Sequence, residues 1–340
     1  METKSDATGI APAARNEDGR RQSDANTPEM PLAVRSRRTR VVDLIRLGRP
    51  VFLGGGVLLY ALGAAIAVAE GAQVNVALLL WGQLAVTSIQ LMTHYSNEYF
   101  DFAADRANST PTRWAGGSRV LPEGRLPASA ALHAAIVLVV MTVLIAWTLV
   151  FILGAGLLAL PLIGLALFLA WSYSAPPLTL HSRGLGELTT AVLVAIAVPL
   201  LAFYLQTGRL DALPLLASVP LFFLQFGMLL LVELPDEKGD AQVGKRTLVV
   251  RLGAYRASQV YVAALLTSYA TLPFLVAAGL PSAVALAVGC VSPLAIWLGW
   301  QLVHGAWSIP ARWESLCFWG IGLLMGTAGA ELVAFLIIGR

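Results

Sequence analysis

The chain has 340 residues and a formal net charge of +3, with 57% hydrophobic and 13% charged residues. Charged residues usually make up about a quarter of a soluble protein, so this composition excludes a soluble domain. Together with a mean hydropathy of +0.72, it indicates an integral membrane protein whose partner is the lipid bilayer and not a nucleic acid.

Residues 1–40 differ from the rest of the chain, because they are polar, contain Pro and Gly, and show no apolar periodicity. Such a segment cannot bury enough apolar surface to offset the entropy lost on ordering, so we expect a disordered cytoplasmic tail. No signal peptide is expected, because the first apolar run begins only near residue 51. Residues 41–340 are predicted to form one transmembrane domain.

The stretch just before the first apolar run is strongly basic. Residues 35–49 contain six arginines, with Asp43 as the one acidic residue. A juxtamembrane cluster of this kind is attracted to anionic lipid headgroups.

Nine apolar stretches follow, each about as long as the 20 residues that a helix needs to cross a bilayer. Their approximate extents are 51–69, 73–97, 128–149, 153–172, 185–205, 213–233, 258–278, 281–301 and 314–337. The pattern predicts an all-α, polytopic bundle of about nine transmembrane helices.

The distribution of positive charge favours one orientation of this bundle. When the spans are threaded in order, 21 of the 23 Lys and Arg residues fall on the side of the N-terminus, and only Arg209 and Arg340 fall on the other. Because cytoplasmic loops are enriched in Lys and Arg, we expect a multi-pass protein of the inner (plasma) membrane with a cytoplasmic N-terminus and an external C-terminus.

An acidic motif, NEYFDFAADRAN, follows the second apolar stretch. On a helix, residues four apart lie on nearly the same face, so Asn97, Asp101 and Asp105 are predicted to form one stripe. Asp101 and Asp105 can then converge on one cation, whereas Glu98 lies a quarter turn away.

A second acidic motif, VELPDEKGD, ends the sixth apolar stretch on the same side of the membrane. Asp236 and Asp240 repeat the spacing of four, and Glu233 joins their face three residues earlier. Glu233 lies at the edge of an apolar run, where a carboxylate is costly and usually functional.

Either motif alone is equally well explained as the solvated end of a membrane helix. Both motifs, however, are followed by cations: Arg106, Arg113 and Arg119 after the first, and Lys238, Lys245 and Arg246 after the second. Carboxylates are the ligands that Mg²⁺ prefers, and Lys and Arg bind the remaining phosphate oxygens. The combination indicates a site for a diphosphate held through Mg²⁺.

With these motifs, the chain resembles the UbiA superfamily of intramembrane aromatic prenyltransferases, over essentially its whole length after the tail. The family has an Asn-containing acidic motif after its second helix and a DxxxD motif after its sixth. Asn97, Asp101 and Asp105 match the first motif, and Asp236 and Asp240 match the second. Many members have Asp directly after the Asn, where this chain has Glu98.

Three further stretches are similar to the 1,4-dihydroxy-2-naphthoate prenyltransferases of menaquinone synthesis. They are GGSRVLPEGRLP, YSAPPLTLHSRGLGE and GDAQVGKRTLVVRLG. Those enzymes often have Asn and Arg just before the second acidic pair, where this chain has Glu233 and Pro235. Other acceptors therefore stay open: 4-hydroxybenzoate, homogentisate or a lipid.

The resemblance implies Mg²⁺-dependent transfer of a polyprenyl group from a polyprenyl diphosphate to an aromatic small molecule. The implied roles divide into three sets. The metal ligands are Asn97, Asp101, Asp105, Asp236 and Asp240, the diphosphate-binding residues are Asn97, Arg119, Lys245 and Arg246, and the catalytic residues are Asp101, Asp236 and Tyr173. Tyr173 would shield the allylic cation or orient the acceptor, although an interfacial anchor explains it equally well.

Two other classes of membrane protein fit the sequence less well than a prenyltransferase. A transporter gathers polar residues near the middle of the membrane, whereas these acids lie at helix ends. A CDP-alcohol phosphatidyltransferase also uses Mg²⁺ and aspartates, but its DG, AR and GxxxDxxxD pattern is absent from the sequence.

Overall fold

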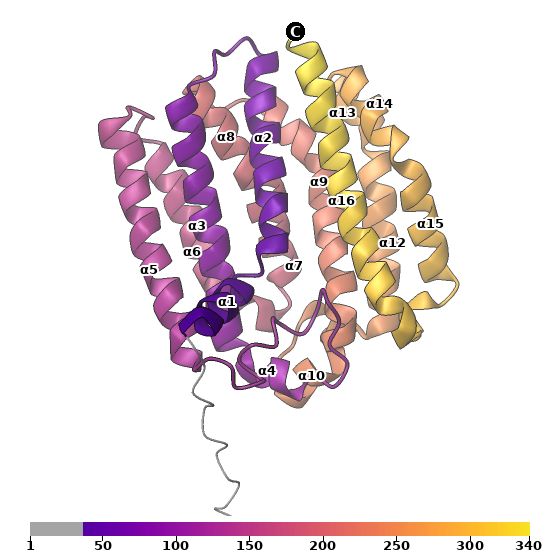
Figure 1. Ribbon diagram of the computed structural model, residues 1–340. Coiled ribbons are helices and arrows are strands. Elements are labelled where there is room, and N and C mark those ends of the chain that lie inside the picture. Colours follow the sequence, from indigo (N-terminus) through magenta and orange to yellow (C-terminus); the bar gives the residue numbers. More distant parts are fainter. Residues whose placement is uncertain (1–36) are drawn as a thin grey trace, which may run out of the picture. The chain divides into compact units, whose positions relative to one another are not determined.

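The structure, a computed structural model, describes residues 37–340, and every regular element in that range is a helix (Figure 1). The predicted disordered tail lies almost entirely outside the described residues and stays a prediction. The first described element is α1 (Arg37–Leu47), which contains part of the arginine-rich stretch.

The first half of the bundle contains four apolar helical segments at the predicted places. They are η1 and α2 (Pro50–Phe52 and Leu53–Ala69), α3 (Val76–Phe100), α5 and η2 (Ala128–Trp147 and Thr148–Ile152), and α6 (Ala159–Ser174). Asn75 caps the start of α3: its side chain accepts a hydrogen bond from the Leu78 N–H at 3.1 Å and so satisfies a donor of the first turn.

The second half contains five further segments. They are α7, η4 and α8 (Gly186–Thr190, Ala191–Ala197 and Val198–Thr207), α9 (Ala212–Glu233), α12 and α13 (Ala254–Ala270 and Leu272–Ala277), α14 and α15 (Ser282–Cys290 and Ser292–Val303), and α16 (Pro310–Ile338). Pro310 opens α16, where its missing N–H removes a donor that would have no partner.

The predicted all-α polytopic membrane fold is confirmed. Within residues 37–340, seven helices are long and apolar enough to cross a membrane, and α14 with α15, bent by 46°, can form an eighth span. The fourth predicted stretch, 153–172, corresponds to α6, which is apolar and helical but has only 16 residues. It reaches about 24 Å at 1.5 Å per residue, which is less than the hydrocarbon core of about 30 Å.

Short helices gather at one end of the bundle. Besides α1, they include α4 (Phe102–Ala107), η3 (Leu180–Arg183), η5 (Leu234–Asp236), α10 (Glu237–Gln242) and α11 (Leu248–Leu252). Figure 1 shows α1, α4 and α10 at this end and the C-terminus at the opposite end.

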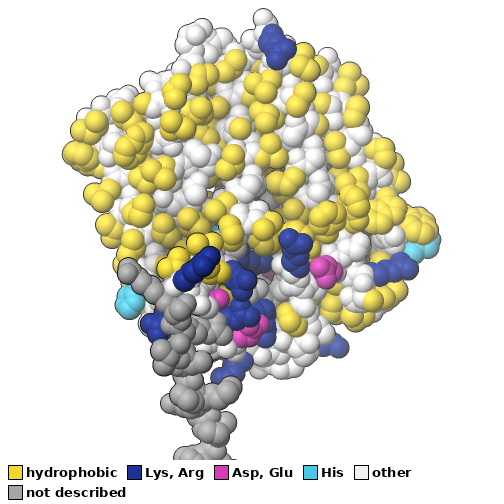
Figure 2. Space-filling view, in the orientation of Figure 1, with side chains coloured by type: hydrophobic (Ala, Val, Ile, Leu, Met, Phe, Trp, Pro, Cys, Tyr) yellow, Lys and Arg dark blue, Asp and Glu magenta, His cyan; other side chains and the backbone are white. Residues whose placement is uncertain are grey.

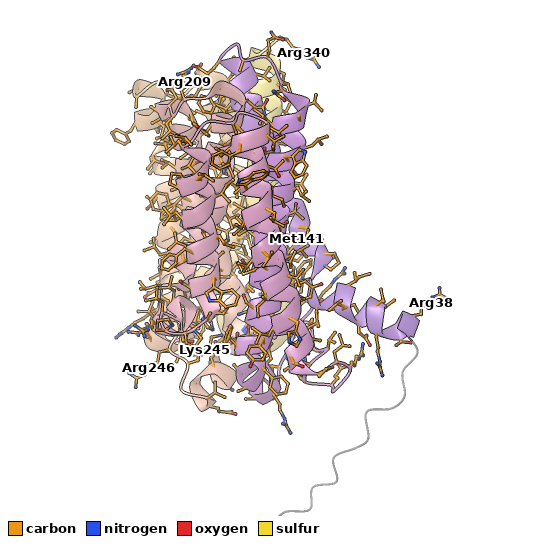
Figure 3. The ribbon with its side chains drawn as sticks, turned by 90° about the vertical axis from the view of Figure 1, so that its left-hand side faces the viewer. Arg38, Met141, Arg209, Lys245, Arg246 and Arg340 are labelled. Atoms are coloured by element: carbon orange, nitrogen blue, oxygen red, sulfur yellow. The ribbon has the colours of Figure 1, made fainter. Side chains whose placement is uncertain are left out.

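Labelled Lys and Arg side chains lie at both ends of the bundle. Arg38, Lys245 and Arg246 lie at the end with the short helices, and Arg209 and Arg340 lie at the other (Figure 3). Between the two ends, the face in Figure 2 is mostly hydrophobic. Large apolar side chains elsewhere in the described residues are also exposed, such as Leu157 and Phe274 at 70% and 76%.

Close helix packing holds the bundle together. A Cβ atom at Gly63 of α2 would lie 2.0 Å from the carbonyl oxygen of Pro199 in α8, so only glycine allows these two backbones to approach so closely. α2 also packs against α3 and α16, and this arrangement fixes the end of α3 from which the first acidic motif extends.

Candidate active site

The first acidic motif lies where α3 ends and α4 begins. The Asp101 N–H donates to the Asn97 carbonyl at 2.7 Å, so helical geometry continues to the end of α3. The Asn97 Nδ2 atom lies 3.5 Å from the Asp101 Oδ2 atom. Asp105 follows one turn later in α4 and is buried. The structure therefore brings the three predicted side chains to neighbouring positions.

The second acidic motif lies where α9 continues through η5 into α10. Asp240 is buried, and its Oδ2 atom has no hydrogen-bond partner within residues 37–340. α10 packs against α4, and a Cβ atom at Gly239 would lie 3.0 Å from the Cα atom of Asn108. This close approach places the two acidic motifs opposite each other.

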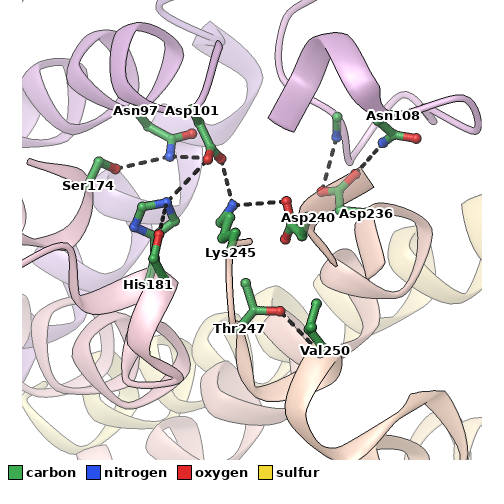
Figure 4. Close-up of polar contacts among 12 residues, drawn as sticks. Asn97, Asp101, Asn108, Ser174, His181, Asp236, Asp240, Lys245, Thr247 and Val250 are labelled. Carbon is green, nitrogen blue, oxygen red and sulfur yellow. Dashed lines mark hydrogen bonds and ion pairs between the residues drawn. The ribbon is translucent and has the colours of Figure 1, made fainter. Parts of the chain in front are cut away.

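Lys245 links the two motifs (Figure 4). Its Nζ atom lies 2.8 Å from Asp101 Oδ2 and 3.3 Å from Asp240 Oδ1. The side chains of Lys245, Asp101 and Asp240 are 11%, 13% and 4% exposed, respectively. The turn after α10 fixes this lysine, because its N–H donates to the Asp240 carbonyl at 3.0 Å.

The pKa values of these groups follow from burial and from this cation. Burial by itself would raise the pKa of Asp101, but Lys245 and His181 hold it well below its usual range. Burial acts against the ammonium of Lys245, but the Asp101 and Asp240 carboxylates raise the pKa of Lys245. Burial and the charge of Asp101 raise the pKa of Asp105 to about 9. Asp105 is therefore a buried carboxyl group close to other carboxylates, where a bound cation would offset the repulsion.

Asp236 is held by the segment that follows α4. The Asn108 Nδ2 atom donates to Asp236 Oδ1 at 2.5 Å, and the Gly116 N–H donates to Asp236 Oδ2 at 3.3 Å. These two hydrogen bonds orient both carboxylate oxygens of Asp236.

The first motif is held from a third part of the chain, the end of α6 and the segment after it. The His181 Nε2 atom lies 3.2 Å from Asp101 Oδ1, and its Nδ1 atom lies 2.6 Å from the Tyr173 carbonyl oxygen. Ser174 Oγ accepts a hydrogen bond from Asn97 Nδ2 at 3.0 Å. The Tyr173 ring stacks on the His181 ring at 5.2 Å between centroids, so Tyr173 lies beside the first motif.

The two predicted arginines lie in different surroundings. The Arg119 guanidinium donates to the Asp105 carbonyl and is half-buried. Arg246 is exposed, and its side chain projects outward from the bundle (Figure 3). The structure therefore brings Lys245 into the cluster and leaves the side chain of Arg246 outside it.

Three residues of this cluster were not singled out in the sequence: Asn108, Ser174 and His181. All three lie in stretches that were, since Asn108 ends NEYFDFAADRAN and the other two belong to YSAPPLTLHSRGLGE. The sequence thus shows each of them as a polar residue in a stretch that resembles the family, but it does not indicate which residue each one contacts.

The donor set fits a divalent cation that also takes ligands from a bound molecule. Within residues 37–340, no three His, Cys, Asp or Glu side chains are placed to hold a metal ion by themselves. Such a cation would be stabilised at two places. One is the buried Asp240 Oδ2 atom, which has no partner among the described residues, and the other is Asp105, which lies close to other carboxylates. Mg²⁺ commonly binds through one or two carboxylates, with water and phosphate oxygens completing its coordination.

Fold and site together define a class: a polytopic helical membrane protein with two opposed acidic motifs at one end of its bundle. The sequence model of the UbiA prenyltransferase family matches residues 57–329. The chain belongs to this family and is a prenyltransferase.

Two curated relatives carry the same name, 1,4-dihydroxy-2-naphthoate octaprenyltransferase. The protein of Bacillus subtilis is 26% identical over 245 residues, which cover 70% of this chain and 75% of the relative. The protein of Haemophilus influenzae is 29% identical over 180 residues, which cover 51% of this chain and 56% of the relative.

Solved structures with this fold are more distant in sequence. A UbiA homologue from Aeropyrum pernix, without ligand, has a TM-score of 0.62 at 18% identity, over 81% of this chain and 96% of that one. A UbiA homologue from Archaeoglobus fulgidus, bound to DMAPP and Mg²⁺, has a TM-score of 0.55 at 18% identity, over 87% and 99% of the two chains.

Proposed function

We propose that the protein transfers a polyprenyl group from a polyprenyl diphosphate to 1,4-dihydroxy-2-naphthoate, and that the reaction requires Mg²⁺. The observation that carries this proposal is the position of Lys245, whose ammonium lies between carboxylates of two opposed acidic motifs. A diphosphate bridged to carboxylates needs both fixed positive charge and metal ions.

The residues that would hold Mg²⁺ are Asn97, Asp101, Asp105, Asp236 and Asp240. When bound, Mg²⁺ would neutralise negative charge on the diphosphate and so make it a better leaving group. Asn108, Gly116 and His181 keep the carboxylates of Asp236 and Asp101 directed, through the hydrogen bonds described above.

Lys245 and Arg119 would contact the diphosphate directly. As the allylic C–O bond breaks, its electron pair stays on the diphosphate, and a preorganised cation stabilises the growing charge. The ammonium of Lys245 is already positioned by two carboxylates and needs only to exchange one of them for a phosphate oxygen. Arg246 is exposed, so we assign the diphosphate contacts to Lys245 and Arg119 in its place.

Tyr173 would contact the allylic cation or the acceptor ring. A ring carbon of the acceptor forms the new C–C bond and then releases the group it carried, a proton or a carboxylate lost as CO₂. The aromatic ring of Tyr173 is fixed against His181, and the negative face of an aromatic ring stabilises a nearby cation.

The names of the two curated relatives support the naphthoate as the acceptor. The departures at Glu233 and Pro235 keep 4-hydroxybenzoate, homogentisate and a lipid as alternatives. The excess of Lys and Arg at the end with the acidic motifs supports a cytoplasmic active site and an external C-terminus.

The test uses membranes that contain the full chain, Mg²⁺ and a labelled polyprenyl diphosphate. Dihydroxynaphthoate, 4-hydroxybenzoate and homogentisate are added separately, and the lipid product is identified by mass. We expect product with dihydroxynaphthoate. Product with another acceptor alone would contradict the proposed acceptor, and no product with any acceptor would contradict the proposed function.

A further inference from the structure

Glu98 is hydrogen-bonded to the loop between α4 and α5. It is 1% exposed, and both of its carboxylate oxygens are engaged by one residue. The Ser118 N–H donates to Glu98 Oε1 at 2.5 Å, and the Ser118 hydroxyl donates to Glu98 Oε2 at 2.8 Å. Glu98 thus binds the loop between α4 and α5 through a pair of charge-assisted hydrogen bonds.

The part of the loop around Ser118 touches both acidic motifs. Gly116 donates its N–H to Asp236, and the Arg119 guanidinium donates to the Asp105 carbonyl. A Cβ atom at Gly117 would lie 2.1 Å from Asp105 Oδ2, so the backbone of this glycine lies directly against that carboxylate. Residues 116–119, which we call the clasp, therefore cover Asp105 and Asp236.

The backbone of the clasp needs an external restraint. Gly117 has φ of +68°, and Arg119, which is not a glycine, has φ of +65°. Residues other than glycine rarely adopt this left-handed conformation, which persists where surrounding contacts enforce it. Ser118 lies between these two residues, and its bonds to Glu98 supply such contacts.

We propose that Glu98 is a positioning residue, which holds Ser118 and thereby keeps the clasp over Asp105 and Asp236, and that it is not a metal ligand. The inference deepens the proposed function and rests on it, because the clasp would order the carboxylates that receive Mg²⁺ and the diphosphate. Loss of Glu98 would weaken binding of the metal and the donor while leaving binding of the acceptor unchanged.

Substitutions of Glu98 can test separately whether the length or the charge of its side chain matters. Glu98→Gln keeps the length and both partners, because its amide oxygen accepts from the Ser118 N–H and its amide nitrogen donates to the Ser118 hydroxyl. Glu98→Asp keeps the charge but is one methylene shorter and cannot reach Ser118. A positioning residue tolerates Gln and not Asp, whereas a metal ligand tolerates Asp better than Gln.

The experiment compares purified full-length E98Q, E98D, E98A and S118A with the unmodified chain. Mn²⁺ binding is measured by electron paramagnetic resonance with and without polyprenyl diphosphate, and the KM values for donor and acceptor are determined separately. Glu123→Gln is the matched control, because Glu123 lies in the same loop but is exposed and pairs with Arg125.

We expect E98Q and E123Q to resemble the unmodified chain. E98D and E98A should weaken Mn²⁺ binding and raise the donor KM by about tenfold or more, since small displacements of an active-site group can cost that much. The acceptor KM should not change, and a double E98A and S118A variant should be no worse than E98A. If E98Q is impaired as severely as E98A, or if E98D resembles the unmodified chain, the proposal is wrong.

A second measurement needs no substrate. Trypsin cleavage after Arg119 reports the position of the clasp, and it should accelerate in E98D and E98A but not in E98Q. Unchanged cleavage in all variants would overturn the positioning role even if transfer is observed. If the unmodified chain shows no transfer but cleavage follows the expected pattern, the proposed function is contradicted and the proposed role of Glu98 in holding the clasp is not. If E98A does not fold, the comparison of E98D with E98Q carries the test.

Discussion

Replacement of Lys245 by Met should destabilise the protein mainly in the absence of divalent metal. The lysine is 11% exposed and pairs with Asp101 and Asp240, which are 13% and 4% exposed. Removing one partner of a buried ion pair typically costs about 3–5 kcal/mol, because it leaves uncompensated charge. Since Asp101 keeps its contacts with His181 and Asn97, we expect a value near the lower limit, about 3 kcal/mol.

Mg²⁺ should reverse much of this loss. A metal ion that binds the same carboxylates supplies the missing positive charge, and it stabilises only the folded state. In the unmodified chain it must compete with the ammonium of Lys245, so the gain in stability on adding Mg²⁺ should be larger in Lys245→Met.

The assay is thermal unfolding in detergent, followed by the fluorescence of the nine tryptophans, in EDTA and in Mg²⁺. Lys238→Met is the control, because it removes the same charge from an exposed position on α10 and should melt like the unmodified chain. Melting of Lys245→Met at the unmodified temperature in EDTA would refute the reasoning, as would an equal effect of Mg²⁺ on both proteins.

Three other results are expected. Asp101→Asn and Asp236→Asn should each abolish transfer while leaving expression and membrane insertion intact, and appreciable turnover in detergent would contradict their assignment as ligands. Arg246→Ala should keep a donor KM close to that of the unmodified chain, because its side chain is exposed and projects outward from the bundle; a large rise measured by steady-state kinetics would show that it moves inward. EDTA should abolish turnover and added Mg²⁺ should restore it, whereas full activity after exhaustive chelation would exclude a metal requirement.

The fold could be predicted because the bilayer imposes a simple rule on the sequence. Helices that satisfy their own backbone groups must be apolar over about 20 residues, and such stretches are visible without knowledge of their neighbours. The spacing of Asn97, Asp101 and Asp105 likewise follows from local helix geometry. The length of α6 could not be predicted, because the apolar run continues through the turn at Gly154 and Gly156 without a polar residue.

The contacts within the site depend on how distant loops return to the helix ends. Lys245 and Arg246 are adjacent and both basic, yet only the path of the loop after α10 determines which of them meets Asp101. Asn108 and Asp236 are 128 residues apart, and no local pattern pairs them. Glu98 lies inside the first acidic motif, but its hydrogen-bond partner Ser118 is 20 residues away on the loop between α4 and α5, and no local spacing indicates this pair.

The short α6 has a consequence for the surrounding bilayer. No Asp, Glu, Lys or Arg occurs from Ala128 to Ser182. The turn between η2 and α6 therefore carries no charged side chain that would anchor it in the headgroup region. Backbone groups outside regular helices are not tolerated in contact with acyl chains. The segment formed by α5 and η2 has 25 residues, about 37 Å at 1.5 Å per residue, so it is long enough to place that turn beyond the hydrocarbon core. α6 alone falls about 6 Å short of the hydrocarbon core. Hydrophobic mismatch costs fractions of a kcal/mol per Å, so this shortfall is a modest cost that the lipid next to α6 would meet, while the longer helices keep the rest of the bilayer at its usual thickness.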